Sequence, residues 1–515
     1  MKSSIRSIML LVIALVYFAC AEIKEKQHPN ILFIMSDDHT SQAWGIYGGI
    51  LKDYVHTPNI KRLADEGVVL DNVFCTNSIC VPSRAAIITG QYSHKNGVYT
   101  LSDALSPDSM NIAKLLRGAG YHTAIIGKWH LKKEPSGFDY YNVLHDQGRY
   151  WDPILKTKEN FHKPPEEWDV HKGFSTDVIT DLAIDWMGSI DRKKPFFLMC
   201  HFKATHEPFD YPDRHKELYK DVDLPEPENL YDFGKETTGR SFIGQQLENL
   251  GWRYKQASDA PGKWWCKYPG LPFYTTGLDS VARRKKIYQK FVKDFLRSGA
   301  AIDDNIGRLL DYLEKTGLAE NTVVIYTADQ GYFLGEHGFF DKRLIYEESL
   351  RMPFVIRYPK EISGGKRLGD VVMNIDFAPL FADYAGVKIP SSMQGRSFRK
   401  NLTGKTPDNW RKTAYYRYWQ HYPIRPAHFG IRNDRYKLIL FYGQPLDMTG
   451  VSKEITPPAY EFYDLRKDPR ENHNAVNDPE YAGIIEEMKA ELKRQRELYG
   501  DTDEKYPVIQ EMLKK

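Results

Sequence analysis

The feature that most constrains this sequence is a series of short apolar runs of strand length. Four of them end in charged or polar residues: NILFIMSDD, YHTAIIGKWH, PFFLMCHFKATHEP and NTVVIYTADQG; a fifth run is RMPFVIRYP. Segments with helical spacing of apolar residues separate them, at 58–66, 110–118 and 288–316. Buried strands that alternate with helices predict an α/β fold with a central, mostly parallel sheet flanked by helices.

The polar ends of the four runs predict where a site would form. In parallel sheets, ligands bind beyond the carboxyl ends of the strands. We therefore expect these ends to meet. They carry Asp37 and Asp38, Lys128 and His130, Lys203 and His206, and Asp329 and Gln330.

The last fifth of the chain has a different texture. Short aromatic runs (TAYYRYW, HFGIRND, RYKLILFY, YEFYDL) precede a charged helical segment at 479–499. This pattern predicts a small C-terminal subdomain, 410–515, with an antiparallel sheet and one covering helix. The large domain then spans 28–400, and 394–409 connects the two. Within the large domain, 210–279 is rich in aromatic residues and proline, and we interpret it as an insertion that forms part of a substrate wall.

The amino terminus has the pattern of an export signal. Lys2 and Arg6 precede an apolar run at 8–18, which is too short to span a bilayer. Cleavage after Ala21 predicts a signal peptide at 1–21 and a periplasmic or cell-surface protein without a membrane span. The alternative is a lipoprotein signal with the lipid on Cys20.

Net charge and cysteine content argue against a nucleic-acid-binding protein and against a disulfide-rich fold. The 515 residues carry a formal net charge of +3, so nothing global points to nucleic acid. The five cysteines are Cys20, Cys75, Cys80, Cys200 and Cys266. With Cys20 lost or lipidated and Cys80 reserved for chemistry, at most one disulfide bond could form.

Cys80 stands in an unusual context, CTNSICVPSRAAIITGQYSHKNGV. Pro82 suits the first turn of a helix, and Gly90 can end it. Cys80 would then lie at the amino end, where free N–H groups favour an anion. One interpretation is a cysteine nucleophile of low pKa, which would need a base and an acyl-transfer site.

A longer motif favours a different interpretation. Cys80-x-Pro82-Ser83-Arg84, followed by Thr89-Gly90 and Gly97-Val98, resembles the signature of the type I sulfatases, a family with the alkaline-phosphatase-like fold; Ile88 replaces the usual leucine. The resemblance extends over about 30–465, and the insertion is its weakest part. It implies that a sulfatase-maturing enzyme oxidises Cys80 to formylglycine (3-oxoalanine). The hydrated aldehyde would attack sulfur, form a sulfo-enzyme intermediate and then expel inorganic sulfate.

The resemblance also implies a metal site. Asp37, Asp38, Asp329 and Gln330, with an oxygen of residue 80, would hold one divalent cation. Gln330 replaces the Asn or His that is usual in the family. An all-oxygen ligand set suits a hard ion such as Ca²⁺. The alternative for the paired aspartates is a helix cap or a solvated position.

The remaining polar residues take roles from the same resemblance. Arg84 and His130 would hold the hydroxyls of the gem-diol. Lys128, His206 and Lys342 would hold the sulfate oxygens and the leaving oxygen, where negative charge develops. His206, with Lys342 beside it, is the candidate acid. A solvated surface role is the alternative for any one of them, and His201 could equally be a core histidine.

Two other functions remain open at this point. One is a phosphatase or phosphodiesterase of the same superfamily, which would use Thr or Ser and two metals. The other is a non-catalytic glycan-binding protein. Among sulfatases, the C-terminal region is most similar to bacterial carbohydrate sulfatases, including N-acetylglucosamine-6-sulfatase-like enzymes. These would act on a glycosaminoglycan, mucin or other sulfated glycan. The candidate sugar contacts are Trp419, His421, His428 and Arg432.

Overall fold

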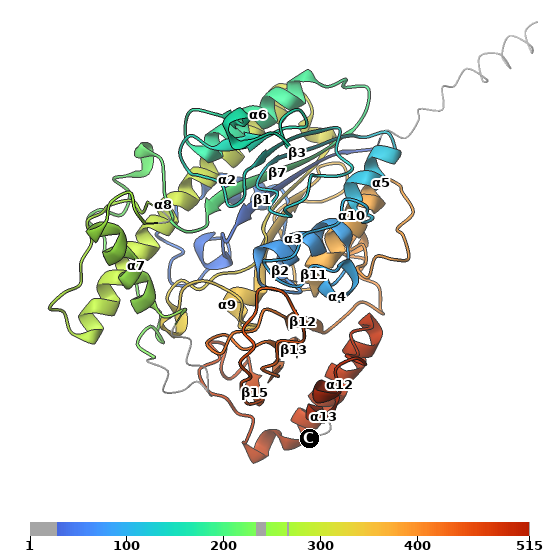
Figure 1. The fold of residues 1–515 in the computed structure, drawn as a ribbon. Helices are drawn as coiled ribbons and strands as arrows, with labels where there is room; N and C mark the ends of the chain where they lie inside the picture. The colour runs from blue at the N-terminus through green and yellow to red at the C-terminus, as the bar shows by residue number, and fades with distance from the viewer. Residues whose placement is uncertain (1–27, 233–243, 265–266, 514–515) are drawn as a thin grey trace, which may run out of the picture.

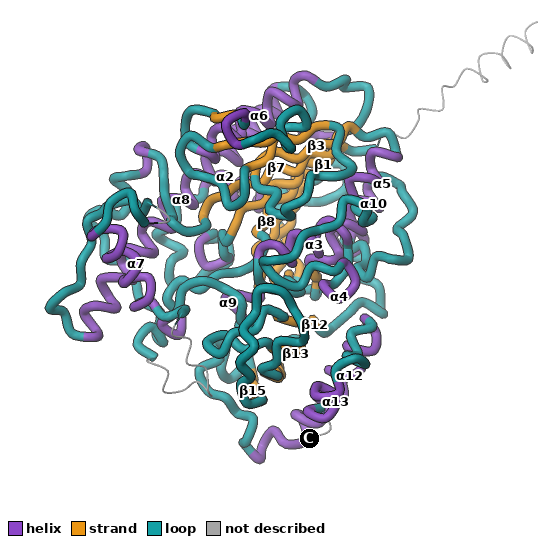
Figure 2. The backbone as a smooth tube through the Cα atoms, viewed as in Figure 1, coloured by secondary structure: helices purple, strands orange, loops and turns teal. Residues whose placement is uncertain are grey.

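The computed structural model describes residues 28–232, 244–264 and 267–513, and its centre is an 11-stranded sheet. Strands occupy the middle of the large domain, with helices outside them (Figure 2). In spatial order the strands are β10 (Lys366–Leu368), β2 (Val68–Phe74), β9 (Arg351–Arg357), β8 (Thr322–Ala328), β1 (Asn30–Asp37), β7 (Phe196–Thr205), β3 (His122–Gly127), β4 (Tyr140–Leu144), β5 (Ile154–Lys156) and β6 (Asp169–Val170), and β11 (Val372–Met373) pairs with β2.

The four runs with polar ends form four adjacent parallel strands, in the order β8-β1-β7-β3. The prediction of a parallel centre is therefore confirmed. The sheet as a whole is mixed, because β9, formed by the fifth run, is antiparallel to both β2 and β8. In β1, Phe33 and Met35 enter one hydrophobic core while Leu32 and Ile34 enter the other, so both faces of the strand are buried.

Helices cover both faces of this sheet (Figure 1). One face is covered by α2 (Pro58–Asp65), α6 (Ser175–Ser189) and the carboxyl half of α8 (Ser280–Lys315). The other is covered by α3 (Cys80–Thr89), α5 (Ile112–Gly118) and α10 (Phe377–Tyr384). Shorter helices are α4 (Ser93–Asn96), α9 (Glu347–Leu350) and α11 (Arg399–Leu402). The three predicted helical segments correspond to α2, α5 and α8.

Helix α3 is formed as its sequence predicts. Cys80 is its first residue, Pro82 lies in its first turn, and all ten of its residues are buried. Gly90 ends it with a φ of 67°, a left-handed conformation that costs glycine little. The helix therefore brings its amino end, with Cys80, against the sheet.

The insertion forms a separate layer beside α8. Its helix α7 (Leu247–Asp259) contacts α8, and Leu250 and Tyr254 pack against Ile287 and Phe291 in a third hydrophobic core. Cys266, which lies in the insertion, is outside the described residues.

The C-terminal subdomain contains a four-stranded antiparallel sheet, in the order β12 (Ala414–Tyr418), β13 (His428–Arg432), β14 (Tyr436–Phe441) and β15 (Ala459–Asp464). The predicted covering helix is α12 (Ala482–Tyr499), which packs on β12, β13 and β14. A second short helix, α13 (Pro507–Met512), follows it, so the prediction of one helix was incomplete. Residues of this sheet belong to the same hydrophobic core as Ile31 and Phe33, so the two domains are packed together.

The predicted export signal lies outside the residues that the structure describes. The expected signal peptide and Cys20 lie in 1–27. In the described part of the chain, no helix combines the length and the hydropathy needed to cross a bilayer. Cys75, Cys80 and Cys200 are buried free thiols.

Candidate active site

Three carboxylates meet at the carboxyl ends of β1 and β8. Asp37 ends β1, Asp38 follows it, and Asp329 follows β8. All three are at most 1% exposed, and one oxygen of each lies within 4.8 Å of the others. Asp38 has a positive φ of 68°, and its backbone N–H donates to Asp329 Oδ1 at 3.2 Å. The structure thus brings together the aspartates that the sequence predicts to meet at the strand ends.

Cys80 lies against this carboxylate cluster. Its Sγ is 3.3 Å from Asp37 Oδ1 and 3.9 Å from Gln330 Nε2. Burial raises the pKa of the Cys80 thiol to about 12, although the charge of Lys342 opposes the shift. The thiol is therefore protonated at neutral pH, which disfavours the interpretation of Cys80 as a thiolate nucleophile.

Three buried cations surround the carboxylates. Lys342 Nζ lies 2.6 Å from both oxygens of Asp38. Arg84 Nε and Nη2 each lie 3.0 Å from Asp329 Oδ2. Lys128 Nζ contacts Asp37 Oδ2. Because each acid has a cation beside it, the buried charges are locally compensated, as buried ions require.

Lys128 reaches this position because of a glycine. Gly127 ends β3 with a φ of 101°, and a Cβ there would lie 1.9 Å from His201 O on the neighbouring β7. Only glycine fits so close to another backbone. His201 itself is buried and lies with Nδ1 3.2 Å from Lys128 O, so the alternative of a core histidine holds for this residue.

The donor set fits a hard divalent cation. Carboxylates of three aspartates cluster within 4.8 Å, and Gln330 Oε1 is buried without a hydrogen-bond partner in the described structure. Gln330 Nε2 lies 2.5 Å from Asp38 Oδ1, and rotation of this amide would turn its oxygen to the same side. Oxygen ligands of this kind suit Ca²⁺ or Mg²⁺ more than zinc.

The two predicted histidines lie at the rim of the cluster. His206 Nε2 is 4.0 Å from Asp38 Oδ2, and its Nδ1 lies 2.9 Å from Glu207 O. His130 has a φ of 57°, and its Nε2 is 3.7 Å from Asp146 Oδ1. Burial, followed by nearby lysines and, for His130, Arg84, lowers the pKa of both imidazoles well below the usual value. Both are neutral in this state, so an acid role for His206 requires an added negative charge nearby.

Sequence reasoning missed the residues that hold these groups in place. Gln147 Oε1 accepts from Lys128 Nζ at 2.6 Å. In the insertion, Arg253 Nη1 donates to Glu207 Oε2 at 2.6 Å, next to His206. Gln245 Nε2 donates to the backbone oxygen of Lys342 at 2.7 Å. No local pattern marks these residues, because their partners are between 19 and 97 positions away in sequence.

The four predicted sugar contacts are buried in protein. His428 is fully buried, with its ring centroid 4.7 Å from that of Phe441, and His421 Nε2 lies 2.7 Å from Glu454 O. Trp419 is stacked on Arg417, whose Cζ is 3.5 Å from the ring centroid. Arg432 pairs with Glu347 at 3.1 Å. Side chains in these positions support the small domain and do not form a sugar-facing wall in this conformation.

A neighbouring loop of the small domain does reach the site. Between β12 and β13, Arg425 Nη1 lies 3.3 Å from Asp341 Oδ2, and Arg343 Nε lies 2.9 Å from the same oxygen. Asp341 and Arg343 flank Lys342 in sequence. A Cβ on Gly244 of the insertion would lie 2.8 Å from Ile424 Cδ1. Three distant segments therefore converge beside Lys342, with half-buried polar side chains.

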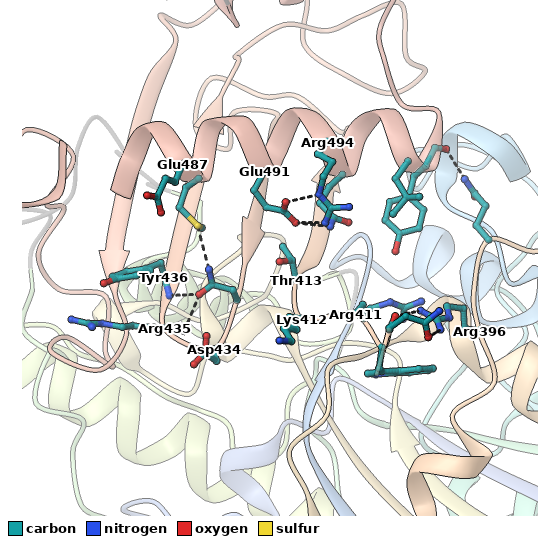
Figure 3. A pocket seen from close by; sticks show the side chains of 18 of the residues that line it. Arg396, Arg411, Lys412, Thr413, Asp434, Arg435, Tyr436, Glu487, Glu491 and Arg494 are labelled. Carbon is teal, nitrogen blue, oxygen red and sulfur yellow. Dashed lines mark hydrogen bonds and ion pairs between the residues drawn. The ribbon is translucent and has the colours of Figure 1, made fainter. Parts of the chain in front are cut away.

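A separate cavity lies away from the carboxylate cluster. It encloses about 1080 Å³ beneath α12, against residues of the connection and of the small sheet (Figure 3). Two ion pairs join residues of its lining, Arg494 Nη2–Glu491 Oε1 at 2.6 Å and Arg466 Nη2–Asp434 Oδ2 at 2.7 Å. It shares no lining residue with the carboxylate cluster, so its size does not mark the reaction site.

Comparison with known proteins agrees with this geometry. The profile of the Sulfatase family matches residues 29–387, and the profile "N-sulphoglucosamine sulphohydrolase, C-terminal" matches 335–498. The chain is 39% identical to an N-acetylglucosamine-6-O-sulfatase of Bacteroides thetaiotaomicron, over 98% of this chain and 93% of the relative. It is 28% identical to an arylsulfatase of Clostridium perfringens, over 92% of this chain and 96% of that relative.

Solved structures extend the similarity to three dimensions. One, a complex with its substrate D-glucosamine-2-N,6-O-disulfate, has a TM-score of 0.82 and 38% identity, and the match covers 93% of this chain and 99% of that one. The family profile covers most of the chain, and one relative is 39% identical over nearly its whole length. The alkaline-phosphatase-like architecture and the cluster at the strand ends agree with this assignment. This chain belongs to the sulfatase family and is a sulfuric ester hydrolase.

Proposed function

We propose that this protein is an exported carbohydrate sulfatase that removes the 6-O-sulfate of a glucosamine residue in a sulfated glycan. The observation that carries the proposal is the meeting of Cys80, three aspartates and three cations at one edge of the sheet. The similarity to an N-acetylglucosamine-6-O-sulfatase and to a complex with a glucosamine disulfate supports the choice of sugar.

In the proposed active form, Cys80 is formylglycine. The maturing enzyme would remove sulfur and oxidise Cβ to an aldehyde, which water hydrates to a gem-diol. Cys80 Sγ, at the start of α3, lies 3.3 Å from Asp37 Oδ1 and 3.9 Å from Gln330 Nε2, which supports the proposal that the new oxygens would lie beside these residues. A gem-diol has a second hydroxyl, which allows it to release sulfate without a separate water nucleophile. A serine or cysteine ester lacks this route.

Asp37, Asp38, Asp329 and Gln330 are the proposed ligands of one Ca²⁺, with an oxygen of residue 80. When bound, such an ion lowers the pKa of a nearby hydroxyl and stabilises negative charge. Lys128 and Lys342 now lie against Asp37 and Asp38, so they are within reach of an anion held at this cluster.

The cations and histidines would bind the sulfate ester. Lys128 and Lys342 supply fixed positive charge where the equatorial oxygens and the leaving oxygen become negative, which lowers the barrier. Arg84 and His130 are proposed to orient the nucleophile. A bound sulfate would oppose the lysine charges that depress the pKa of His206. That imidazole could then carry the proton for the leaving alcohol.

The sugar would lie beside Lys342. Asp341, Arg343 and Arg425 are half-buried there and offer both acceptors and donors to hydroxyl groups. This assignment replaces Trp419, His421, His428 and Arg432 as sugar contacts.

The test is sulfate release from a defined panel, using protein co-produced with a sulfatase-maturing enzyme. The panel contains N-acetylglucosamine 6-sulfate, its 3-sulfate isomer, an aryl sulfate and the matching 6-phosphate. We expect the highest kcat/KM on the 6-sulfate and little hydrolysis of the phosphate. Preference for the phosphate would support the phosphatase alternative. Binding without turnover by fully matured protein would support the glycan-binding alternative.

A further inference from the structure

A second, smaller cavity shares a wall with the reaction site. It encloses about 280 Å³, and His130 lines it together with Trp129, Lys132, His145, Asp146 and Lys156. His130 is 7% exposed, and its Nδ1 has no hydrogen-bond partner in the described structure. The cavity therefore begins at a side chain that is proposed to orient the nucleophile.

Lys156 is built into this cavity as an uncompensated cation. It ends β5, and its Nζ lies 3.9 Å from the ring centroid of Trp168 and 4.9 Å from that of Phe161. Among the described residues, no carboxylate lies within 4.0 Å of this amine. The two rings hold the amine by cation–π contact and exclude water from one side of it.

The rest of the cavity adds positive charge. Lys132, with a φ of 65°, is exposed and also has no carboxylate within 4.0 Å among the described residues. His145 lies with its ring centroid 4.4 Å from that of Trp168. Asp146 is the one acid among the residues that line the cavity, and its side chain is 67% exposed and 3.7 Å from His130. The cavity thus carries two lysines against one solvated carboxylate.

We propose that this cavity binds a second anionic group, a sulfate or a carboxylate, on the same saccharide that presents the scissile sulfate. The inference rests on the proposed function. Sulfate and carboxylate are both compact anions. Either one would lie on the sugar that carries the reacting ester or on the sugar linked next to it. Lys156 and Lys132 recognise it by charge, and Trp168 and Phe161 hold Lys156 in place. The substrate class is therefore a glycan with at least two anionic groups.

The experiment compares kcat/KM for three substrates of the matured enzyme. N-acetylglucosamine 6-sulfate carries the scissile group alone, glucosamine-2-N,6-O-disulfate adds a sulfate, and a disaccharide of N-acetylglucosamine 6-sulfate with a uronic acid adds a carboxylate. We expect wild type to prefer one of the two doubly anionic substrates. In Lys156→Met that preference should fall by about fivefold, the size of one partly exposed ion pair. Lys156→Arg should retain most of it.

The ratio of two kcat/KM values does not change with the fraction of folded or matured protein. The matched control is Lys163→Met, which removes an exposed lysine that pairs with Glu167 outside the cavity. This variant should keep the wild-type ratio. A wild-type enzyme with equal kcat/KM on all three substrates, or an unchanged ratio in Lys156→Met, would overturn the inference and leave the proposed function standing. Failure of wild type to release sulfate from any saccharide would overturn both.

Discussion

At the scale of single residues, Lys342 has the most direct link between position and chemistry. It is 3% exposed, and both oxygens of Asp38 lie 2.6 Å from its amine. Burial opposes its charge, but Asp38 and other acids raise the pKa of this lysine above its ordinary value. The amine therefore remains charged across the working pH range and can stabilise developing negative charge.

We predict that Lys342→Met lowers kcat by about 10²–10³ on every sulfate ester, the loss expected for one fixed donor in a dry site. An aryl sulfate and a sugar sulfate should lose equally, because both develop the same charge at sulfur. Steady-state kinetics on both substrates measures this. Lys366→Met, at an exposed position of β10, is the control and should behave as wild type. A loss confined to the sugar sulfate would place Lys342 in the sugar subsite instead.

At the scale of elements, the ends of adjacent strands determine the site. The sequence predicts that four runs with polar ends lie side by side, and they do, because apolar runs of this length are stable only between covering helices. Asp37, Asp38, Asp329 and Lys128 could therefore be placed from sequence alone. The antiparallel direction of β9 could not, since a short apolar run has no signal for direction.

The contacts that the insertion makes with the site could not be predicted from the sequence. Arg253 of α7 holds Glu207 at 2.6 Å, and Glu207 follows His206 in the chain. Tyr268 contacts the same carboxylate. The periodicity of a helix predicts which face is buried, but it does not identify a partner 46 positions away in the sequence.

We predict that Arg253→Met lowers kcat by about tenfold or more, because a displaced acid loses rate steeply with distance. The measurement is the alkaline limb of the kcat–pH profile, which should shift if His206 moves, because a proton donor is lost as it deprotonates at higher pH. Thermal melting is measured alongside. Arg253→Lys should restore part of kcat. Lys255→Met on the same helix is the control, because this lysine pairs with Asp259 and with no other acid among the residues that the structure describes. An unchanged pH profile with a lowered melting temperature would reduce Arg253 to a structural role.

The strand-end ligands give a second prediction at this scale. Dialysis against a chelator should abolish turnover, and Ca²⁺ should restore it better than Zn²⁺, because the proposed ligands all donate through oxygen. Elemental analysis should find about one divalent ion per chain in wild type and far less in Asp38→Ala. Two zinc ions per active chain would contradict the assignment.

At the scale of the whole molecule, the small domain packs against the large domain and contacts a residue next to Lys342. Its sheet shares a hydrophobic core with the large domain, and its β12–β13 loop brings Arg425 to Asp341. Sequence reasoning located this domain and expected it to contact sugar. The four residues predicted as sugar contacts are buried, because aromatic and histidine side chains in short strands pack inward as readily as they line a surface.

We predict opposite outcomes for two substitutions in this domain. His428→Ala removes a fully buried ring and should lower the free energy of unfolding by about 2–4 kcal/mol, with no change in the ratio of kcat/KM for sugar and aryl sulfates. Arg425→Met should leave melting nearly unchanged and lower kcat/KM for the sugar sulfate by about tenfold, with the aryl sulfate spared. Thermal melting and kinetics on both substrates measure these effects. A changed substrate ratio in His428→Ala would return that residue to the sugar site.

The central claim is that Cys80 is converted to formylglycine, the nucleophile in sulfate ester hydrolysis. Mass spectrometry of the peptide that contains Cys80, taken from preparations of different specific activity, tests it most directly. We predict that specific activity rises in proportion to the fraction of peptide found as aldehyde or hydrate, and that Cys80→Ala has none. Full activity in a preparation whose Cys80 peptide carries only the unmodified thiol would contradict the account.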